Sequence, residues 1–312
     1  GGGIRARTER RGGVRPGEKA LVLGSGGASQ TVQAVLRAAG AEVTVLSRQG
    51  ENRYSTLPEH KDARLVVNAT PVGMYPKNGE RLIDLSVLPD CRCVLDLIYN
   101  PARTRLLLDA EARGIRCING LSMLVAQAKR AAELFTGCAI DDAVCGNILR
   151  RLSVQMRNII LIGMPGSGKT TVGSLLAREL GRPFLDADAE IEGVASCPIP
   201  EFFRKNGEDA FRVLETRVLA ELGKRSGCVI ATGGGCVTRE ENYDLLHQNG
   251  TIFWLRRAIG ELPVDGRPVS QSRDLSELYR EREPAYRRFA DFGIENEVTP
   301  EKAALKIKEE LL

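Results

Sequence analysis

Short runs of apolar residues recur along the chain, and stretches with apolar residues at helical spacing lie between several of them. A continuous apolar run is typical of a strand buried on both faces, and alternation of such runs with helices is typical of a parallel sheet. In the first half, the strand-like runs are residues 20–23, 43–46, 65–68, 93–96 and 116–118, and the helical stretches include 30–39 and 104–112.

The second half repeats this alternation of strand-like runs and helical stretches. Because both halves have the same pattern, the sequence predicts an α/β protein with two doubly wound parallel-sheet domains. The strand-like runs of the second half are residues 158–162, 184–186, 228–231 and 251–255.

One helical stretch lies between the two halves. Asp141 or Asp142 can cap it, and apolar residues at helical spacing follow as far as residue 152. We interpret residues 141–155 as the last helix of the first domain. The expected domains are therefore residues 1–155 and 156–312.

The charge of the chain is nearly balanced, with 44 basic and 40 acidic side chains among 312 residues and a formal net charge of +4. This balance is too even for a general nucleic-acid or membrane-surface binder. Aromatic residues make up only 5% of the chain, too few for an extended stacking surface for single-stranded nucleic acid. We therefore expect a small-molecule substrate and neither a nucleic-acid nor a membrane partner. The sequence does not predict an oligomeric state.

Two further features bear on location. No apolar run approaches the ~20 residues that cross a bilayer, and residues 1–15 lack the apolar core of a signal peptide. The eight cysteines include no C-x-x-C pair, and His60 and His247 are the only histidines, a pattern that favours buried or edge thiols over a zinc site. Free thiols fit a reducing cytoplasm.

The segment 163–170, with the sequence GMPGSGKT, matches the phosphate-loop pattern G-x4-G-K-[ST]. It follows an apolar run and precedes a helical stretch, which is the context this motif requires. Backbone N–H groups of such a loop and the N-terminus of the next helix bind phosphate oxygens. We expect Lys169 to reach the β- and γ-phosphates of a nucleoside triphosphate and Thr170 to bind Mg²⁺. The other residues expected to contact the nucleotide are Gly166, Ser167, Gly168 and Thr171.

Five motifs follow the phosphate loop in a fixed order. They are DAD at 186–188, GEDAFRVLE at 207–215, TGGG at 232–235, GRP at 266–268 and REPAY at 282–286. Together with the loop, they make residues 157–312 resemble a shikimate kinase over essentially its whole length. The resemblance implies a P-loop kinase domain that phosphorylates shikimate to shikimate 3-phosphate with ATP and Mg²⁺, a step in chorismate and aromatic amino acid biosynthesis.

The resemblance also implies roles for individual residues. Asp188 corresponds to the carboxylate that binds the shikimate hydroxyls and positions the attacking one. Asp186, which we place on the same strand face, corresponds to the group that holds Mg²⁺ through water. Arg212, oriented by Glu215, and Arg282 correspond to the pair that clamps the substrate carboxylate, a task suited to planar guanidinium groups. The residues whose backbone would pack against the ring are Gly233, Gly234 and Gly235.

Ordinary structural roles are the alternatives for these residues. Asp186 or Asp188 can cap a helix, Arg212 and Arg282 can be solvated helix charges, and three glycines can form a turn. A kinase for another small polyol, such as gluconate, or for a nucleoside monophosphate also stays open. The arginine pair and the Asp-x-Asp motif favour a carboxylated polyol.

Residue Arg267 resembles the lid arginine that reaches the phosphates when the lid of these kinases closes. The preceding segment 259–266 departs from the family because it carries no additional basic residue and looks short. The segment 294–300 matches the adenine-side loop only approximately.

A second glycine-rich turn follows the first strand-like run. Gly24, Gly26, Gly27 and Ala28 lie where a helix begins, and glycine there permits close approach of a pyrophosphate. The next strand-like run is followed by Ser47 and Arg48. A basic residue at this position favours the 2′-phosphate of NADP over NAD.

Later motifs in this half are NATPVGM at 68–74, DLIYNP at 96–101 and GLSML at 120–124. With the glycine turn, they make residues 17–153 resemble the Rossmann-type NADP-binding domain of shikimate dehydrogenases. The resemblance implies that Asn68, Thr70 and Met74 line the nicotinamide side and that Tyr99 and Gln127 touch the substrate.

The catalytic Lys and Asp of shikimate dehydrogenases belong to a substrate domain that precedes this segment, and residues 1–18 contain no lysine. We therefore expect a fragment of a bifunctional dehydrogenase–kinase, with NADP(H) binding possible but little dehydrogenase turnover in the chain as given. The alternative is a non-catalytic NADP-binding or docking module attached to a small-polyol kinase.

Overall fold

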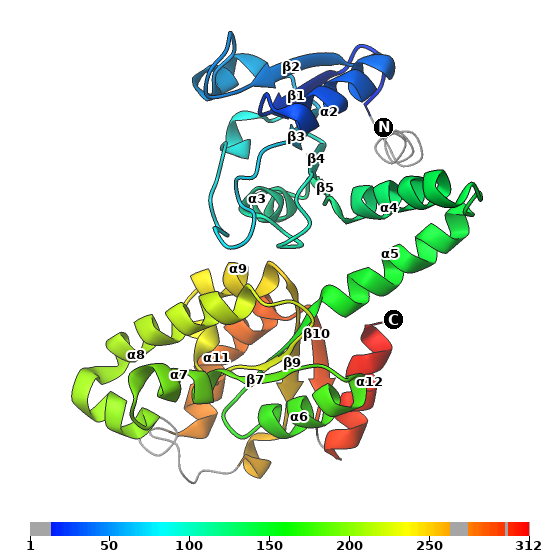
Figure 1. Ribbon diagram of the computed structural model, residues 1–312. Helices are drawn as coiled ribbons and strands as arrows, with labels where there is room; N and C mark the ends of the chain where they lie inside the picture. The colour runs from blue at the N-terminus through cyan, green and yellow to red at the C-terminus, as the bar shows by residue number, and fades with distance from the viewer. Residues whose placement is uncertain (1–13, 263–273, 297–298, 312) are drawn as a thin grey trace. The chain divides into compact units, whose positions relative to one another are not determined.

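A computed structural model describes residues 14–262, 274–296 and 299–311 of the chain. The chain divides into two compact units, Gly1–Ser153 and Val154–Leu312. Each unit contains its own parallel sheet (Figure 1).

The first unit is built on a five-stranded sheet in the order β2-β1-β3-β4-β5, with every strand pair parallel. Helices cover both faces of this sheet, because alternate residues of each strand belong to separate cores. Leu21 and Leu23 pack with α3, whereas Ala20 and Val22 pack with α2. The elements are β1 (Lys19–Leu23), α2 (Gly27–Ala38), β2 (Glu42–Leu46), η1 (Tyr54–His60), β3 (Leu65–Asn68), η2 (Leu85–Val87), β4 (Cys93–Asp96), α3 (Arg105–Ala112) and β5 (Arg116–Ile118).

Two helices follow this sheet, α4 (Leu121–Thr136) and α5 (Asp142–Met156). The predicted helix 141–155 agrees with α5 to within one residue at each end. Its apolar stripe is not buried, since Val144 and Ile148 are 47% and 43% exposed. The division between the units falls inside α5, so the boundary at residue 155 stays a prediction. None of the described helices is long and apolar enough to cross a membrane.

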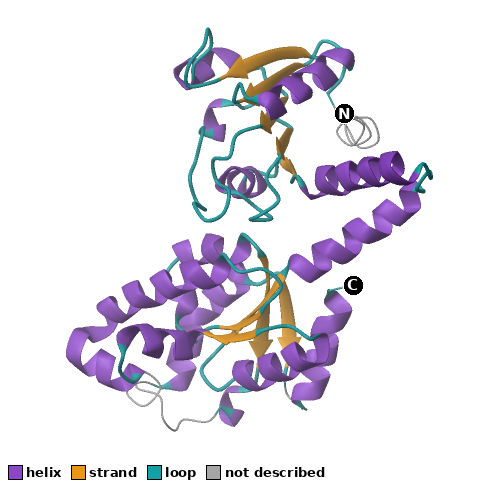
Figure 2. Cartoon of the chain, viewed as in Figure 1, coloured by secondary structure: helices purple, strands orange, loops and turns teal. Residues whose placement is uncertain are grey.

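The second unit contains a five-stranded parallel sheet in the order β10-β9-β6-β8-β7 (Figure 2). Its strands also alternate between two cores: Ile159 and Leu161 pack with α6 and α12, and Ile160 and Ile162 pack with α7, α8, α9 and α11. The elements are β6 (Asn158–Ile162), α6 (Lys169–Leu180), β7 (Phe184–Asp186), α7 (Ala187–Ala195), α8 (Ile199–Gly223), β8 (Val229–Ala231), η3 (Cys236–Thr238), α9 (Glu241–His247), β9 (Gly250–Arg256), η4 (Ile259–Glu261), α11 (Leu275–Phe289), β10 (Phe292–Glu295) and α12 (Pro300–Glu310).

The doubly wound α/β fold predicted for both halves is thus confirmed. In open parallel sheets, ligands bind beyond the carboxyl ends of the strands. In the second unit, β6 leads into the phosphate loop, β7 ends at Asp186, and β8 leads into the segment 232–235. Three strands therefore deliver the predicted kinase residues to one edge of the sheet.

Candidate active site

The phosphate loop connects β6 to α6. Gly168 has a φ of 92°, and a Cβ there would lie 2.5 Å from Asn296 Nδ2, so this position requires glycine. The Asn296 amide in turn donates a hydrogen bond to the Ser167 carbonyl at 2.8 Å. Lys169 is 8% exposed, and its Nζ donates to the carbonyls of Gly163 and Met164 at 2.9 and 3.0 Å. These two bonds hold the Lys169 side chain against the phosphate loop.

The carboxylate of Asp186 makes two contacts at the end of β7. Its Oδ2 accepts a hydrogen bond from Thr170 Oγ1 at 2.9 Å, and its Oδ1 accepts one from the backbone N–H of Asp188 at 3.0 Å and so caps α7. Because β7 ends at Asp186, Asp188 lies in the first turn of α7. The expectation that both carboxylates share a strand face is therefore wrong. The turn nevertheless brings both to the same cavity.

The three glycines after β8 form a surface against which charged side chains lie. A Cβ on Gly233 would be 2.7 Å from Glu215 Oε1 and 2.9 Å from Asp188 Oδ1. A Cβ on Gly235 would be 2.2 Å from Arg212 Nη1. Since contacts this short are not tolerated, side chains at these positions would displace the carboxylates and the guanidinium.

Residue Arg212 belongs to α8, which has a break at Gly207, where φ is 81° and ψ is 176°. The residue is 7% exposed. Nη1 donates to Glu215 Oε2 at 2.6 Å, and Nη2 and Nε donate to Glu208 Oε1 at 3.1 and 3.3 Å. Burial acts to lower the pKa of Arg212, but the two carboxylates outweigh it and raise the pKa.

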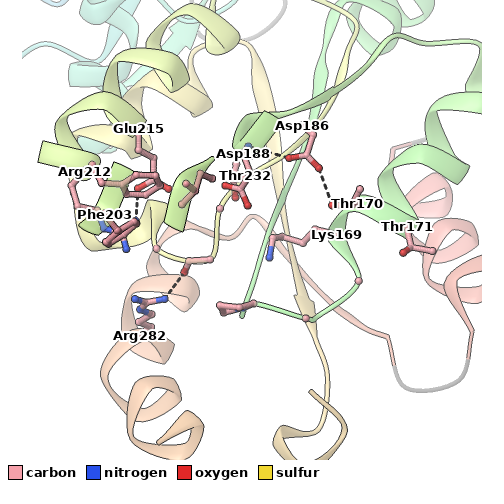
Figure 3. Close-up of a pocket in the computed structure, with 18 of the residues that line it drawn as sticks. Lys169, Thr170, Thr171, Asp186, Asp188, Phe203, Arg212, Glu215, Thr232 and Arg282 are labelled. Carbon is pink, nitrogen blue, oxygen red and sulfur yellow. Dashed lines mark hydrogen bonds and ion pairs between the residues drawn. The ribbon is translucent and has the colours of Figure 1, made fainter. Parts of the chain in front are cut away.

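Residue Arg282 lies on α11 and is 6% exposed. Its Nη1 donates to the carbonyl of Gly234 at 3.1 Å, and Tyr286 Oη, one helical turn away, donates to the same carbonyl at 2.5 Å. The two bonds fix α11 to the glycine segment. They also hold Arg282 at the same cavity as Arg212 (Figure 3).

These residues surround one cavity of about 370 Å³, which we call the kinase cavity. Figure 3 shows Lys169 and Asp188 between Thr170 on one side and Arg212 and Arg282 on the other. The kinase cavity is lined by Pro165, Gly166, Gly168, Lys169, Thr170, Thr171, Asp186, Asp188, Ile199, Phe203, Phe211, Arg212, Glu215, Thr232, Gly233, Gly234, Gly235, Arg257 and Arg282.

Asp188 is an exposed residue that lines the kinase cavity. Partial loss of hydration raises the pKa of Asp188, and Asp186 and Glu192 add to this effect, whereas Lys169 and Arg212 oppose it. A carboxylate with a raised pKa is a better proton acceptor than an ordinary aspartate.

The neighbouring hydroxyl of Thr170 and carboxylate of Asp186 are oxygen donors of the type that Mg²⁺ prefers. Protein Mg²⁺ sites commonly use one or two such groups, completed by water and substrate phosphates. The donor set therefore fits a Mg²⁺ ion bound together with a nucleotide.

The first unit has a cavity of about 550 Å³ at the carboxyl ends of β1 and β3, where the direction of strand order reverses. We call it the switch-point cavity. A Cβ on Gly24 would lie 2.6 Å from Thr70 Cγ2, so glycine is required there. The switch-point cavity is lined by Gly24, Ser25, Gly26, Ser47, Arg48, Gln49, Tyr54, Ala69, Thr70 and Pro71.

The other residues predicted for this cofactor site take several positions. Met74 lines an adjoining cavity of about 380 Å³, which shares Arg48 and Thr70 with the switch-point cavity. Asn68 is 1% exposed and bonds to Thr70 and to the buried Asp96, so it supports the loop and does not form the cavity wall.

Four further predicted residues of the first unit lie outside these two walls. Tyr99, which is 40% exposed, and Gln127, on the surface of α4, belong to neither set of lining residues. Gly27 and Ala28 are exposed in the first turn of α2.

The shikimate kinase model matches residues 165–312. The shikimate kinase of Parasynechococcus marenigrum is 44% identical over 154 residues, which cover 46% of this chain and 80% of that protein. The chain belongs to the shikimate kinase family. The enzyme of Pseudomonas syringae is also 44% identical over 154 residues, covering 46% of this chain and 90% of its own length.

Solved structures with similarity include a shikimate kinase from Acinetobacter baumannii in complex with shikimate. It is 37% identical, with a TM-score of 0.46, and the match covers 52% of this chain and 96% of that one. Shikimate dehydrogenase 1 from Peptoclostridium difficile is 29% identical, with a TM-score of 0.45, and the match covers 48% of this chain and 60% of that one.

Most residues expected from the shikimate kinase resemblance meet at the kinase cavity. They come from the phosphate loop, β7, α7, α8, the glycine segment and α11. Ser167 is 1% exposed and is not among the lining residues, although it lies within the loop. Arg267 lies outside the described residues, and its role stays a prediction.

Several lining or supporting residues of this shikimate kinase site were not identified from the sequence. Phe203 and Phe211, whose ring centroids are 4.4 Å apart, form part of the cavity wall. Phe203 looks like an ordinary core residue in the sequence, so spacing gives no signal for it. Phe211, Thr232 and Glu208 stood inside quoted motifs. Asn296 lies in the approximately matched segment 294–300, but its contact with Ser167 spans 129 positions and leaves no local pattern.

Proposed function

We propose that the second unit catalyses transfer of the γ-phosphoryl group of ATP to the 3-hydroxyl of shikimate. One observation carries this proposal: the phosphate loop, Asp188, Arg212 and Arg282 line a single cavity of about 370 Å³. One side of the cavity thus has groups that can bind phosphate, and the other side has two arginines that can bind a carboxylate. The 44% identity to shikimate kinases over most of their length supports the same substrate.

The substrate would be held at several points. The carboxylate of shikimate suits the buried guanidinium groups of Arg212 and Arg282, because ionic hydrogen bonds are stronger where water is scarce. Its ring would contact Gly233–Gly235, which line the same cavity. Phe203 offers an apolar contact at the same cavity.

The chemical step needs correct alignment and charge stabilisation more than covalent catalysis. The substrate hydroxyl oxygen attacks the γ-phosphorus, the bond from that phosphorus to the β-phosphate oxygen breaks, and Asp188 accepts the hydroxyl proton. Lys169 lies close enough to the loop to stabilise charge on the phosphate oxygens. Thr170 and Asp186 would hold Mg²⁺, which offsets phosphate charge when bound.

The proposal includes Arg267 as a further cation for the phosphates. Its support is the Gly-Arg-Pro motif at 266–268 and its place in the order of motifs. An arginine delivered by a closing lid would add charge stabilisation and exclude water, which limits hydrolysis of ATP.

A coupled ADP-release assay with Mg²⁺, ATP and purified chain tests the kinase proposal, with product identified by mass as shikimate phosphate. Lys169→Met and Arg212→Ala should lose shikimate-dependent ADP release while their circular dichroism stays unchanged. Gluconate and nucleoside monophosphates serve as competing substrates. If wild-type chain releases no ADP in response to shikimate, the proposal is wrong.

A second candidate function concerns the first unit, for which we propose NADP(H) binding. The switch-point cavity places Arg48 near the glycine turn, where a basic side chain can bind a 2′-phosphate. The chain is titrated with NADPH, and the fluorescence of NADPH reports binding. Binding should be saturable, and it should be weaker when NADH replaces NADPH or when the chain carries Arg48→Ala. Binding without reduction of 3-dehydroshikimate would identify a binding or docking module, and equal weak affinity for both nucleotides would contradict the proposal.

Location in the cytoplasm is part of the same proposal. All eight cysteines are free, and three of them, Cys91, Cys228 and Cys236, are buried. Free thiols fit a reducing compartment.

A further inference from the structure

The guanidinium of Arg212 is already bound by two carboxylates of its own helix. Glu215 Oε2 accepts from Nη1 at 2.6 Å, and Glu208 Oε1 accepts from both Nη2 and Nε at 3.1 and 3.3 Å. Nε and Nη2 form one edge of the planar group, an edge that can bind a carboxylate with two parallel bonds. Glu208 therefore binds the edge of Arg212 that is best suited to a carboxylate ligand.

The two glutamates differ in how firmly they are held. The Glu215 side chain is 1% exposed, so removing it from Arg212 would leave a buried charge without its partner. The Glu208 side chain is 54% exposed and uses a single oxygen at longer distances. Water can replace its contact at little cost, as for other exposed pairs four residues apart on a helix.

The neighbouring residues also hold the Arg212 guanidinium in place, so it cannot move away from Glu208 to bind a ligand. One face of its guanidinium lies against Gly235, and its Cζ is 5.2 Å from the centroid of the Phe211 ring. A ligand carboxylate must therefore bind the Arg212 guanidinium in the orientation that it has in this structure. While Glu208 stays bound, two carboxylates face one guanidinium and repel a third.

We infer that Glu208 is an internal competitor for the substrate carboxylate: it binds the Nε–Nη2 edge of Arg212 in this structure and moves into solvent when substrate binds. This inference rests on the proposed function. Its consequence is that part of the affinity of Arg212 for substrate is used to displace Glu208. The competition acts on carboxylate binding and not on the phosphoryl-transfer step.

The test compares Glu208→Gln with wild-type chain. An amide has nearly the same shape but no charge, so competition should weaken, and the KM for shikimate should fall about two- to five-fold, the range expected for an exposed ion pair. The kcat should stay within about two-fold of wild type, since Glu208 does not contact the reacting atoms in the proposed pose. Calorimetric titration with shikimate alone should show the same fall in Kd.

Two controls make the result specific. Glu201→Gln removes the same charge from the same helix, where Glu201 pairs with Lys205 at 2.6 Å away from the kinase cavity, and it should not change KM. The carboxamide of shikimate has no charge to compete, so its affinity should be the same in Glu208→Gln and wild type.

The outcomes separate this inference from the proposed function. Wild-type chain without shikimate-dependent activity would overturn both. Active wild-type chain with an unchanged or raised KM in Glu208→Gln would overturn only the inference, because a raised KM means that Glu208 braces Arg212 for binding. An equal fall for shikimate and its carboxamide would also contradict it, since the effect would not depend on the ligand carboxylate.

Discussion

At the scale of single residues, the kinase cavity depends on backbone that has no side chain. Gly233 and Gly235 let Asp188, Glu215 and Arg212 reach the strand end that a larger residue would block. The glycine segment thus sets where three charged groups lie. Mutating it tests the site geometry without removing any of those groups.

Gly235→Ala should weaken shikimate binding and leave nucleotide binding unchanged. The added Cβ would lie 2.2 Å from Arg212 Nη1, so the guanidinium must move. Loss of ionic hydrogen bonds to the substrate carboxylate should raise the KM for shikimate about 10- to 100-fold. Steady-state kinetics with each substrate varied in turn measure the effect.

The matched control is Gly193→Ala in α7, where a Cβ would have no neighbour within 4 Å. It should leave both KM values unchanged. An unchanged KM for shikimate in Gly235→Ala would mean that Arg212 does not bind the substrate in this position.

The pH profile of activity depends on Asp188. Because its pKa is raised, Asp188 becomes protonated, and stops accepting protons, at a higher pH than an ordinary aspartate. We expect kcat/KM to fall on the acid side as pH passes below this raised pKa. Asp188→Asn should lose about 10²- to 10⁴-fold in kcat, as is typical for loss of a proton acceptor.

The shikimate carboxylate titrates in the same region, so the profiles of wild type and Asp188→Asn are compared directly. The part of the acid limb that belongs to Asp188 should disappear in the variant. A variant with the full wild-type limb would assign the limb to the substrate or to another group.

At the scale of elements, α8 carries the most functional residues and contains an irregularity. The break at Gly207, with φ of 81°, separates the first part of α8 from the segment that carries Arg212 and Glu215. If α8 continued without this break, the part before Gly207 would have a different orientation relative to the part after it. The break therefore allows Phe203 and Arg212 to line the same cavity.

Gly207→Ala should destabilise the second unit, because alanine is strained at a positive φ. We expect a loss of about 1 kcal/mol in the free energy of unfolding, measured by urea denaturation. Gly146→Ala is the control, since Gly146 lies inside α5 without a positive φ and alanine there should not destabilise. Equal stability of Gly207→Ala and wild type would show that the break relaxes at no cost.

The elements also show what the sequence could predict. Apolar runs predicted β3 to β7 with their exact bounds, and β1, β2, β8 and β9 to within one residue at each end. The pattern is clearest where burial is nearly continuous, as in β3, β4 and β6. The strand β10 was not predicted, since Phe292–Glu295 has a glycine and a charged residue and only Ile294 is buried. Helix α4 was not assigned either; only Leu121 and Val125 of its apolar residues are buried, whereas Leu134 and Phe135 are exposed.

Site residues with a motif in the sequence were predicted, and those that depend on tertiary packing were not. Residues with a chemical signature in a motif, such as Lys169, Asp188 and Arg212, were found and lie at the kinase cavity. Phe203 and Arg257 were not, because their role comes only from the packing of distant elements. Asp186 both caps α7 and lines the kinase cavity, so the two interpretations of this carboxylate do not exclude each other.

At the scale of the whole molecule, the two units have separate hydrophobic cores. Each core cluster contains residues of one unit only, with one pair of clusters in each unit. Stability should therefore be distributed between two cooperative units. Ligands specific for one unit provide the test.

Shikimate with a non-hydrolysable ATP analogue should raise the melting temperature of the calorimetric transition of the second unit. NADPH should raise the melting temperature of the transition of the first unit. A ligand at 100 times its Kd stabilises the unit that binds it by about 2.7 kcal/mol, which is several degrees for a domain of this size. Scanning calorimetry with each ligand alone and with both measures the shifts. A single transition that responds to every ligand would show that the units unfold together.

The bond from Asn296 to the Ser167 carbonyl has a consequence for synthesis of the protein. The chain is made from its N-terminus, so the phosphate loop leaves the ribosome 129 residues before the side chain that supports it. A nascent chain that has just completed α6 therefore lacks one support of its ATP-binding loop. Bound ATP should contribute little to folding of this unit until Asn296 has been synthesised, and its sheet must assemble on its own packing first.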